Sequence, residues 1–377
     1  MFDSLSEDKA KLREKFRKFV DNEIVPYAQK ADEEEEYSKE RINCVANQGY
    51  LGYTIPKNYG GIGADMITVG ILNEEFGRGC SSMRSLLTVH GMVSIAISKW
   101  GTKEQKEKLL PRMAKGEIIG AFALTEPEAG SNAKGIKTTA VQDGDGYILN
   151  GKKKWITMGQ VADMFLVFAK VEDKITSFLI DKETEGFSVK PIKGITGVRA
   201  SMLAELTFEN CRVPKENIVG RVGTGISHVA LNCLDYGRYS IACGCVGIGQ
   251  AALEESLAYS KEREQFGKKL MENQLIQEMI ASMVVNVKAA RLLCLNAGNL
   301  KDKGDPDSIM ETWNAKYFAS TMLGKITSDA VQIHGANGFL KGYSVERYYR
   351  DSKINEVIEG STQIHESLIA KNAFRSF

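Results

Sequence analysis

The chain has 377 residues, of which 43% are hydrophobic, and this is enough apolar material for a large core in more than one domain. Its 49 lysines and arginines against 48 aspartates and glutamates leave a formal net charge of +1, so the composition lacks the basic surplus that nucleic-acid binding usually requires. The seven cysteines are odd in number and form no CxxC pair. We expect them to be reduced, buried hydrophobic residues, with no metal site.

The amino terminus shows no charged segment followed by an apolar core, and no apolar run is long enough to cross a bilayer. We therefore expect a soluble cytoplasmic protein whose partners include neither nucleic acid nor a membrane.

Residues 1–118 are predicted to form an N-terminal α-helical domain. Apolar side chains recur at helical spacing between Leu12 and Ile24, and Ser4 with Glu7 has the pattern of a capping box ahead of them.

Residues 119–227 change character and predict a central β domain. Asn150-Gly151 predicts a hairpin turn that leads into Trp155. Three short apolar runs bounded by turn residues predict strands: 165–169, 177–180 and 205–208.

Residues 228–377 are predicted to be helical again. Apolar residues keep the helical period over stretches such as 275–287, and such long periods indicate a bundle. Gly244, Gly247 and Gly249 lie within a helical pattern, where close helix packing is the ordinary explanation. The resulting order of α, β and α differs from the strand–helix alternation of a Rossmann domain.

Two familiar motifs are nearly matched and are rejected. Residues 146–152 match most of a phosphate-binding P-loop, but Lys153 stands where a serine or threonine is required. His365-Glu366 begins like a zinc-binding helix, and the second histidine of that pattern is missing.

Six segments, taken together and in this order, resemble motifs of the acyl-CoA dehydrogenase family. They are GTKEQKEKLLP at 101–111, LTEPEAGS at 124–131, WIT at 155–157, REQFGK at 263–268, QIHGANGF at 332–339 and EGSTQI at 359–364. The resemblance implies an α+β fold with an N-terminal helical domain, a central β-barrel or sandwich domain and a C-terminal four-helix bundle. The implied domain boundaries are 1–118, 119–227 and 228–377.

The resemblance also implies an FAD cofactor. A reduced flavin gathers negative charge near N1 and O2, so backbone N–H groups and hydroxyl groups suit its surroundings. Trp155 is expected to cover the flavin ring and Thr157 to approach N5, although a core aromatic and an ordinary strand residue are the alternatives. The residues assigned to the flavin in this way are Phe122, Leu124, Thr125, Ser131, Trp155 and Thr157.

The remaining cofactor residues imply an oligomer. In the family, Arg263 and Phe266 contact the pyrophosphate and adenine side of the FAD of a neighbouring subunit, and an arginine fork suits pyrophosphate. This sharing implies a homodimer or a homotetramer. Further cofactor contacts are expected from Gln332, Gly335, Ser361 and Gln363.

Glu359 matches the catalytic base of the family. A thioester acidifies its α carbon, so one carboxylate opposite the flavin can remove the α proton while the β hydrogen leaves as hydride. One branch of the family places its base near the position of Gly237, and the glycine here leaves Glu359 as the candidate. A surface glutamate before a helix is the alternative. Arg238 is expected to orient the base or the substrate, with a structural ion pair as its alternative.

The acyl group is expected to be small and polar. Residues 80–91 are small and polar where a fatty-acyl pocket would be apolar, and they resemble a subgroup acting on acyl carrier proteins in polyketide and peptide pathways. Members of that subgroup help to make hydroxymalonyl- or aminomalonyl-type extender units. Glu128, Asn132 and Met158 depart from the common family pattern in the same direction. The expected substrate-binding residues are Arg84, Ser85, Thr88, Ser131 and Arg238.

An acidic carrier protein would require a basic patch at the entrance, for which Arg84, Lys134 and Lys137 are candidates. Three other functions stay open: an ordinary short-chain acyl-CoA dehydrogenase, an oxygen-using flavin oxidase or monooxygenase, and a non-catalytic flavin-binding subunit. The electron acceptor is expected to be an electron-transfer flavoprotein or oxygen.

Overall fold

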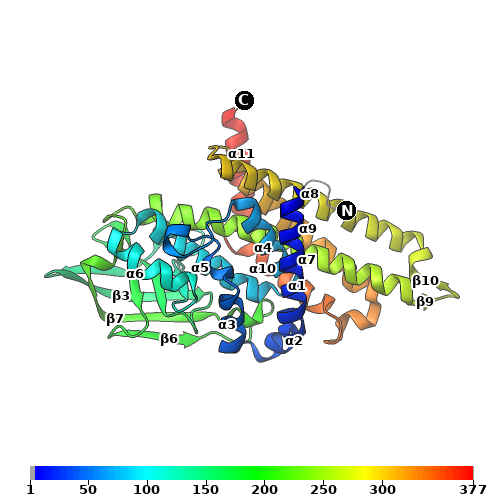
Figure 1. The fold of residues 1–377 in the computed structure, drawn as a ribbon, viewed down its shortest axis with the longest axis horizontal. Helices are drawn as coiled ribbons and strands as arrows, with labels where there is room; N and C mark the ends of the chain where they lie inside the picture. The colour runs from blue at the N-terminus through cyan, green and yellow to red at the C-terminus, as the bar shows by residue number, and fades with distance from the viewer. Residues whose placement is uncertain (1–4, 377) are drawn as a thin grey trace.

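A computed structural model describes residues 5–376, and it divides them into helices, a sheet and helices in chain order (Figure 1). The first part contains α1 (Glu7–Glu23), α2 (Val25–Glu34), α3 (Lys39–Asn47), α4 (Met66–Gly79), α5 (Ser81–Trp100) and α6 (Lys103–Ala114). The hydroxyl of Ser6 caps α1 by accepting the N–H of Lys9. The capping residue is therefore Ser6, two residues after the predicted Ser4, which lies outside the described residues.

The central part is a sheet with the strand order β6-β7-β3-β2-β4-β5-β8, and β1 pairs with β4 outside this path. Most neighbours are antiparallel, whereas β4 runs parallel to β1 and β2. The strands are β1 (Gly120–Ala123), β2 (Thr139–Asp143), β3 (Gly146–Ile156), β4 (Met164–Val171), β5 (Lys174–Asp181), β6 (Phe187–Pro191), β7 (Ala204–Pro214) and β8 (Ile218–Val219).

The predicted hairpin at Asn150-Gly151 is wrong. The turn lies earlier, between Asp143 and Gly146, and β3 continues through Asn150 with a register shift. The amide oxygen of Asn150 accepts the N–H of Asn210 at 2.8 Å and so stabilises a bulge where the sequence suggested a turn. The glycine is required because a methyl group on Gly151 would lie 2.6 Å from the hydroxyl of Thr138.

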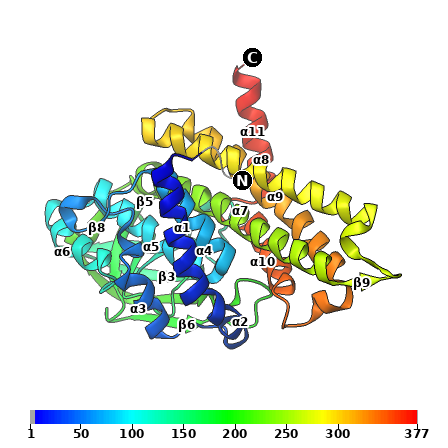
Figure 2. The same ribbon diagram turned by 45° about the vertical axis from the view of Figure 1, so that its right-hand side comes forward.

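The C-terminal part contains the long helices α7 (Leu231–Glu262), α8 (Gln274–Lys303) and α9 (Ser308–His334), which pack with α10 (Val345–Val357). Between α7 and α8 the chain forms a small hairpin of β9 (Glu264–Gln265) and β10 (Lys268–Lys269). A last helix, α11 (Thr362–Ser376), contacts α9 and then projects from the body of the molecule (Figures 1 and 2). No helix within residues 5–376 is long and apolar enough to cross a membrane.

Glycines bring α4 and α7 into close contact, as the helical pattern predicted. A methyl group on Gly247 would lie 1.9 Å from the carbonyl oxygen of Glu74, and one on Gly77 would lie 2.7 Å from the Cα of Gly244. Because α7 also packs against α5 and α9, this one helix joins the N-terminal part to the bundle. Six of the seven cysteines are buried in this packing and elsewhere in the core.

Candidate active site

Glu359 lies in the short link between α10 and α11, in a left-handed conformation with φ of 56°. Left-handed backbone is costly for a residue with a side chain, and such residues concentrate at functional sites. Its carboxyl group rests against α7, where a methyl group on Gly237 would lie 2.6 Å from Glu359 Oε2. The glycine at the alternative base position therefore makes room for the carboxyl group of Glu359.

The carboxyl group of Glu359 has the character of a general base. The residue is partly exposed as a whole, but its Oε2 is buried and has no hydrogen-bond partner within the described chain. Burial raises the pKa of Glu359 to about 7, although Arg238, Lys316 and Arg84 act in the opposite direction. A carboxyl group with a pKa near neutrality and a free oxygen is suited to accept a proton.

Arg238 contacts the backbone of the base. Its Nε donates to the carbonyl oxygen of Glu359 at 2.9 Å, and its guanidinium lies over the ring of Trp313 at 4.9 Å. Burial lowers the pKa of Arg238, and Glu359 and Asp235 oppose this shift. Through this hydrogen bond Arg238 holds the backbone of Glu359, and its predicted role in orienting the base stays a prediction.

Lys316 of α9 was missed by the sequence interpretation. Its Nζ donates to the carbonyl oxygen of Gly360 at 2.8 Å, and its side chain is fully buried. Burial lowers the pKa of Lys316 to about 8, while Cys245 and Glu359 raise it. A lysine on the apolar face of a helix, between Ala315 and Ala319, was the available signal.

Arg84 and Thr88 of α5 belong to a buried polar cluster with α7 and α4. Arg84 Nη1 donates to Thr88 Oγ1 at 2.8 Å, and the hydroxyls of Thr88 and Ser240 are 2.6 Å apart. Ser240 in turn donates to Asn73 Oδ1 at 2.6 Å. Arg84 Nε is buried without a described partner. Burial lowers the pKa of Arg84, whereas Glu359 is among the groups that raise it.

Ser85 does not join this cluster, because its hydroxyl donates to the carbonyl oxygen of Ser82 in its own helix at 2.6 Å. Ser240 and Asn73, which do join it, were not singled out in the sequence. Neither stands in a motif, and both lie within apolar helical patterns.

Arg84 is also wrong as a member of a surface basic patch, because it is only 1% exposed. Lys137 is exposed but forms an ion pair with Glu128. Lys134 and Ser131 are exposed on the same segment.

The turn at 124–131 lies beside the end of β3, as a flavin site would require. The carbonyl oxygen of Thr125 accepts the N–H of Lys154 at 2.9 Å. Trp155 has a left-handed backbone with φ of 63°, lies where the β3–β7 register shifts, and is half exposed. A large aromatic ring held in solvent on strained backbone lacks a packing explanation and suits a flat cofactor.

A buried ion pair holds this turn in place. Lys153 Nζ donates to Glu126 Oε1 at 2.8 Å and to the carbonyl oxygen of Leu124 at 3.1 Å. Glu126 also accepts from the backbone of Lys137 and from Thr138. The pKa of Glu126 is lowered in spite of its burial, because Lys153 lies opposite it. Phe122 packs on Phe168 just before the turn, and Thr157 is half buried just after Trp155.

The other predicted cofactor residues lie elsewhere on the chain. Arg263 and Phe266 stand at the β9–β10 hairpin, at the end of the bundle away from the sheet (Figure 1), and Phe266 is fully exposed. Gln332 is exposed near the end of α9. Gly335, the first residue after α9, has a positive φ of 58°. Ser361 ends the link that carries Glu359, and Gln363 lies in the first turn of α11. The exposed indole of Trp155 beside the turn at 124–131 suits a flat flavin ring, whereas Arg263 and Phe266 lie at the hairpin at the far end of the bundle (Figure 1).

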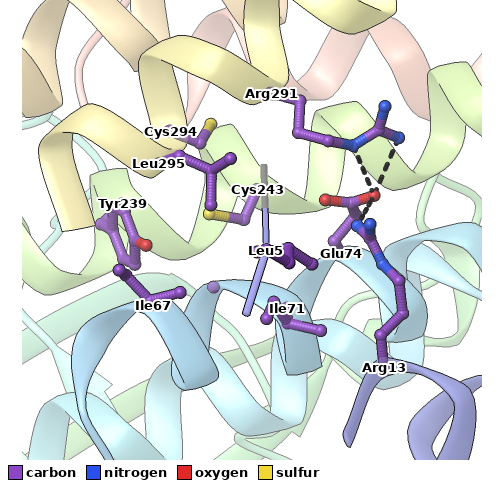
Figure 3. Close-up of a pocket in the computed structure, with 11 residues that line it drawn as sticks. Leu5, Arg13, Ile67, Ile71, Glu74, Tyr239, Cys243, Arg291, Cys294 and Leu295 are labelled. Carbon is purple, nitrogen blue, oxygen red and sulfur yellow. Dashed lines mark hydrogen bonds and ion pairs between the residues drawn. The ribbon is translucent and has the colours of Figure 1, made fainter. Parts of the chain in front are cut away.

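Two cavities lie apart from these residues. The first cavity lies between α4, α7 and α8, and its lining includes Tyr239, Cys243 and Cys294 (Figure 3). The ion pairs of Glu74 with Arg13 and Arg291 lie beside it. Its volume of about 10 Å³ has room for at most one water. A surface groove of about 760 Å³ between α6 and the ends of β4 and β5 is lined by none of the predicted site residues. Neither cavity is a candidate for the substrate.

Comparison with protein families covers nearly the whole chain. Residues 6–117 match the N-terminal domain of acyl-CoA dehydrogenases, residues 121–211 the middle domain, and residues 223–374 the C-terminal domain.

Individual relatives are similar over almost their full length. The acryloyl-CoA reductase (NADH) of Anaerotignum propionicum is 39% identical over 379 residues, which cover 99% of this chain and 96% of that protein. The short-chain specific acyl-CoA dehydrogenase of Clostridium acetobutylicum is 38% identical over 99% of both chains. The crystal structure of the prolyl acyl carrier protein oxidase AnaB has a TM-score of 0.94 at 30% identity and covers 98% of this chain and 100% of that one.

The expected fold is confirmed by these solved and curated relatives, and the cofactor expected from the resemblance is the one that the family uses. Because the three matched domains account for almost all of the sequence, the chain belongs to the acyl-CoA dehydrogenase family, FAD-dependent oxidoreductases that act on CH–CH groups of acyl thioesters.

Proposed function

We propose that this chain dehydrogenates an acyl thioester, and that Glu359 is the base that removes its α proton. The observation that carries the proposal is the buried, unpartnered Oε2 of Glu359, whose pKa is raised to about 7. The α C–H bond breaks, its proton goes to Glu359, and its electron pair forms the new double bond as the β hydrogen leaves with two electrons. Bound FAD supplies the acceptor for that hydride.

The residues of this chain prepare the site for that step. The thioester carbonyl gathers negative charge as the α proton leaves, and a backbone N–H such as that of Glu359 is suited to stabilise it. FAD would be held by the turn from Leu124 to Ser131 and by Trp155 and Thr157. The Lys153–Glu126 pair fixes that turn.

The acyl group is proposed to be small and to carry a hydroxyl group. Arg84, Thr88 and Ser240 lie buried on helices that pack against α7 or belong to it, and Arg84 interacts with Glu359. The buried guanidinium of Arg84 and the hydroxyl groups of Thr88 and Ser240 form a polar cluster, and a polar acyl group suits such a lining better than an aliphatic one. An aminoacyl group would bring an ammonium toward a buried guanidinium, so the geometry favours hydroxyacyl over aminoacyl.

The acyl group is proposed to arrive on the phosphopantetheine arm of a carrier protein. The similarity to AnaB supports this, because that protein is named an acyl carrier protein oxidase. The curated relatives named as CoA enzymes support the alternative, an ordinary short-chain acyl-CoA dehydrogenase. The proposed electron acceptor is an electron-transfer flavoprotein, since one solved relative is described under that name. Oxygen, as in an oxidase, is the alternative acceptor.

An oligomer is also proposed, because the β9–β10 hairpin, which carries Phe266, lies at the opposite end of the molecule from strands β3 and β7 (Figure 1). In a homodimer or homotetramer this exposed hairpin would contact the FAD of a second copy.

The test is stopped-flow flavin reduction in the purified protein with three probes: a hydroxyacyl carrier-protein thioester, the same hydroxyacyl-CoA, and butyryl-CoA. We expect the first probe to be fastest, and Glu359→Gln to bind FAD normally while losing about 10² to 10⁴-fold in rate, because an amide cannot accept the proton. Arg84→Met should slow the hydroxyacyl probes more than butyryl-CoA. Near-normal reduction in Glu359→Gln would place the base elsewhere, and faster reduction by butyryl-CoA would reject the polar acyl group.

A further inference from the structure

The link that carries Glu359 is short and conformationally strained. Only residues 358–361 separate α10 from α11, and Glu359 and Gly360 both have positive φ, of 56° and 97°. A methyl group on Gly360 would lie 2.9 Å from the ring of His365. Such a conformation persists only when its surroundings hold it, so the link requires specific contacts.

Two buried cations from two different helices make those contacts. Arg238 of α7 donates to the carbonyl oxygen of Glu359, and Lys316 of α9 donates to the next carbonyl oxygen, that of Gly360, at 2.8 Å. Consecutive carbonyl groups are thus held from both sides, and the side chain of Glu359 is directed to Gly237 of α7.

Lys316 is an unusual choice for a structural hydrogen bond. It is fully buried, and within residues 5–376 no carboxylate oxygen lies within 4.0 Å of its Nζ. A neutral carbonyl can be satisfied by an uncharged donor, and burying an ammonium without an ion pair is costly. At longer range Cys245, Glu359 and Glu356 favour the charged form of Lys316, and Lys316 in turn lowers the pKa of Glu359.

We propose that Lys316 is a positioning residue for the base: its hydrogen bond to Gly360 holds the left-handed Glu359 in place, and its charge favours the ionised carboxyl group. The inference rests on the proposed role of Glu359 as the base. Lys316 itself contacts neither substrate nor cofactor in this assignment.

The sign of the effect follows from the groups around the site. Removing the positive charge of Lys316 takes away a stabilising partner of the carboxylate, so the pKa of Glu359 must rise and the base must stay protonated to higher pH. The other titratable or charged groups that interact with Glu359 or Lys316 are Arg84 on α5, Cys233, Arg238 and Cys245 on α7, Glu356 on α10 and His365 on α11. His365 has a pKa lowered to about 4 and is neutral over the range of interest.

Two substitutions separate the hydrogen bond from the charge. Lys316→Gln retains an N–H donor for Gly360 and loses the charge, whereas Lys316→Met loses both. Lys325→Met is the matched control, because Lys325 lies on the same helix, is exposed and pairs with Asp329. FAD content and Tm are measured for each holoenzyme.

The titration of Glu359 is measured without substrate, by the infrared carboxyl band that disappears in Glu359→Gln, and the rate of flavin reduction is measured against pH with the fastest of the three probes. We expect Lys316→Gln to move the carboxyl midpoint and the acid limb of the rate to higher pH together. Lys316→Met should add a loss of about 10²-fold in the plateau rate. Lys325→Met should match the wild type.

An unchanged midpoint and plateau rate in both Lys316 variants would overturn the inference. So would variants that lose Tm and FAD but show an unshifted Glu359 midpoint in the folded fraction, because Lys316 would then be purely structural. If Glu359→Gln itself reduces flavin normally, the proposed function fails first, and the two failures are thereby distinguished.

Discussion

At the scale of single residues, the site depends on how close a carboxyl group can come to a helix backbone. The carboxyl group of Glu359 lies against α7 only because residue 237 has no side chain. This contact removes Oε2 from solvent, and desolvation is the largest cause of the raised pKa of Glu359. The glycine is therefore a condition for the acid–base behaviour of its neighbour.

Gly237→Ala should remove most of the activity and leave the cofactor in place. Its new methyl group would stand 2.6 Å from Oε2, so the carboxyl group must move, and a displacement of about 1 Å can cost on the order of 10²-fold in rate. Flavin reduction and FAD content are the measurements. Gly249→Ala is the control on the same helix, since its methyl group would meet no atom closer than 3.3 Å. Equal rates in the two variants would contradict the argument.

At the scale of elements, the turn after β1 is held to the end of β3 by a buried ion pair and a backbone hydrogen bond. The turn proposed to bind the flavin would have to present its N–H groups without rearranging, and Lys153 holds it from an adjacent strand. The two lysines of the P-loop-like segment therefore differ in environment: Lys152 is exposed, whereas Lys153 is buried against Glu126.

Lys153→Met should weaken FAD binding, because it leaves the carboxylate of Glu126 buried and unpaired. Adding Glu126→Gln should recover part of the lost affinity, since the double variant has no unpaired charge. The measurement is FAD affinity by fluorescence titration of the apoprotein, with Lys152→Met as the exposed neighbouring control. The ion pair would have no role in the turn if the single variant bound FAD as tightly as the control.

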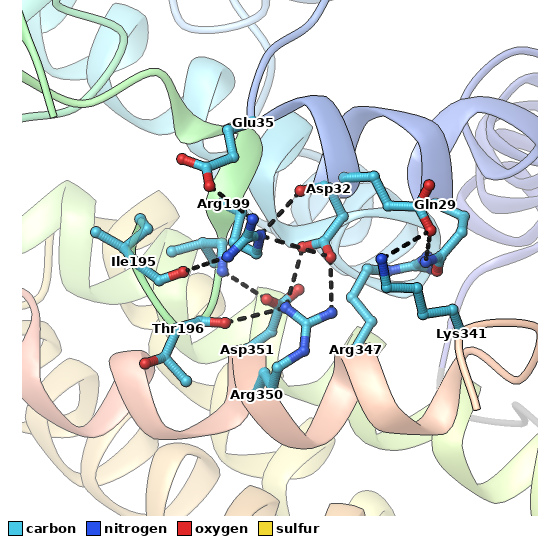
Figure 4. Close-up of polar contacts among 12 residues, drawn as sticks. Gln29, Asp32, Glu35, Ile195, Thr196, Arg199, Lys341, Arg347, Arg350 and Asp351 are labelled. Carbon is cyan, nitrogen blue, oxygen red and sulfur yellow. Dashed lines mark hydrogen bonds and ion pairs between the residues drawn. The ribbon is translucent and has the colours of Figure 1, made fainter. Parts of the chain in front are cut away.

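At the scale of the whole molecule, one polar network joins all three parts of the chain (Figure 4). Arg350 of α10 donates to Asp32 of α2 at 2.6 Å and to the carbonyl oxygen of Thr196, and Asp351 accepts the N–H of Val198 at 2.5 Å. Burial raises the pKa of Asp351 to about 6. The loop at 194–199 is therefore held between the N-terminal helices and the bundle. The chain continues from this loop to Ser201, whose carbonyl oxygen accepts the N–H of Met158, the residue after Thr157.

Arg350→Ala should destabilise the protein by about 2 kcal/mol, because it removes charged hydrogen bonds from the buried carboxylate of Asp32. Thermal unfolding of the FAD-loaded protein measures this. Lys353→Ala is the control, as Lys353 is exposed and pairs with Glu356 of its own helix. A Tm equal to that of the control would mean that the network contributes little to the cohesion of the three parts.

The sequence by itself determined what is local. Periodicity identified the helical ends and the β centre, because the spacing of apolar residues reflects which face of a helix or strand is buried. The helix-packing role of Gly244 and Gly247 followed in the same way, and the motif around Glu359 indicated the base. Local signals failed at Asn150-Gly151, because the same dipeptide suits a turn and a bulge, and the neighbouring strand β7 decided between them.

Only the tertiary structure decided which distant side chains surround the base. Arg84, Arg238 and Lys316 come from three helices, and no spacing in the sequence brings them to Glu359. Their convergence follows from the packing of α5 and α9 on α7, where Gly244 leaves room for the side chain of Arg84. In the sequence, a buried lysine or arginine shows only as a charged residue at an otherwise apolar helix position. Its role depends on the carboxylate that the fold places beside it, which the sequence pattern does not give.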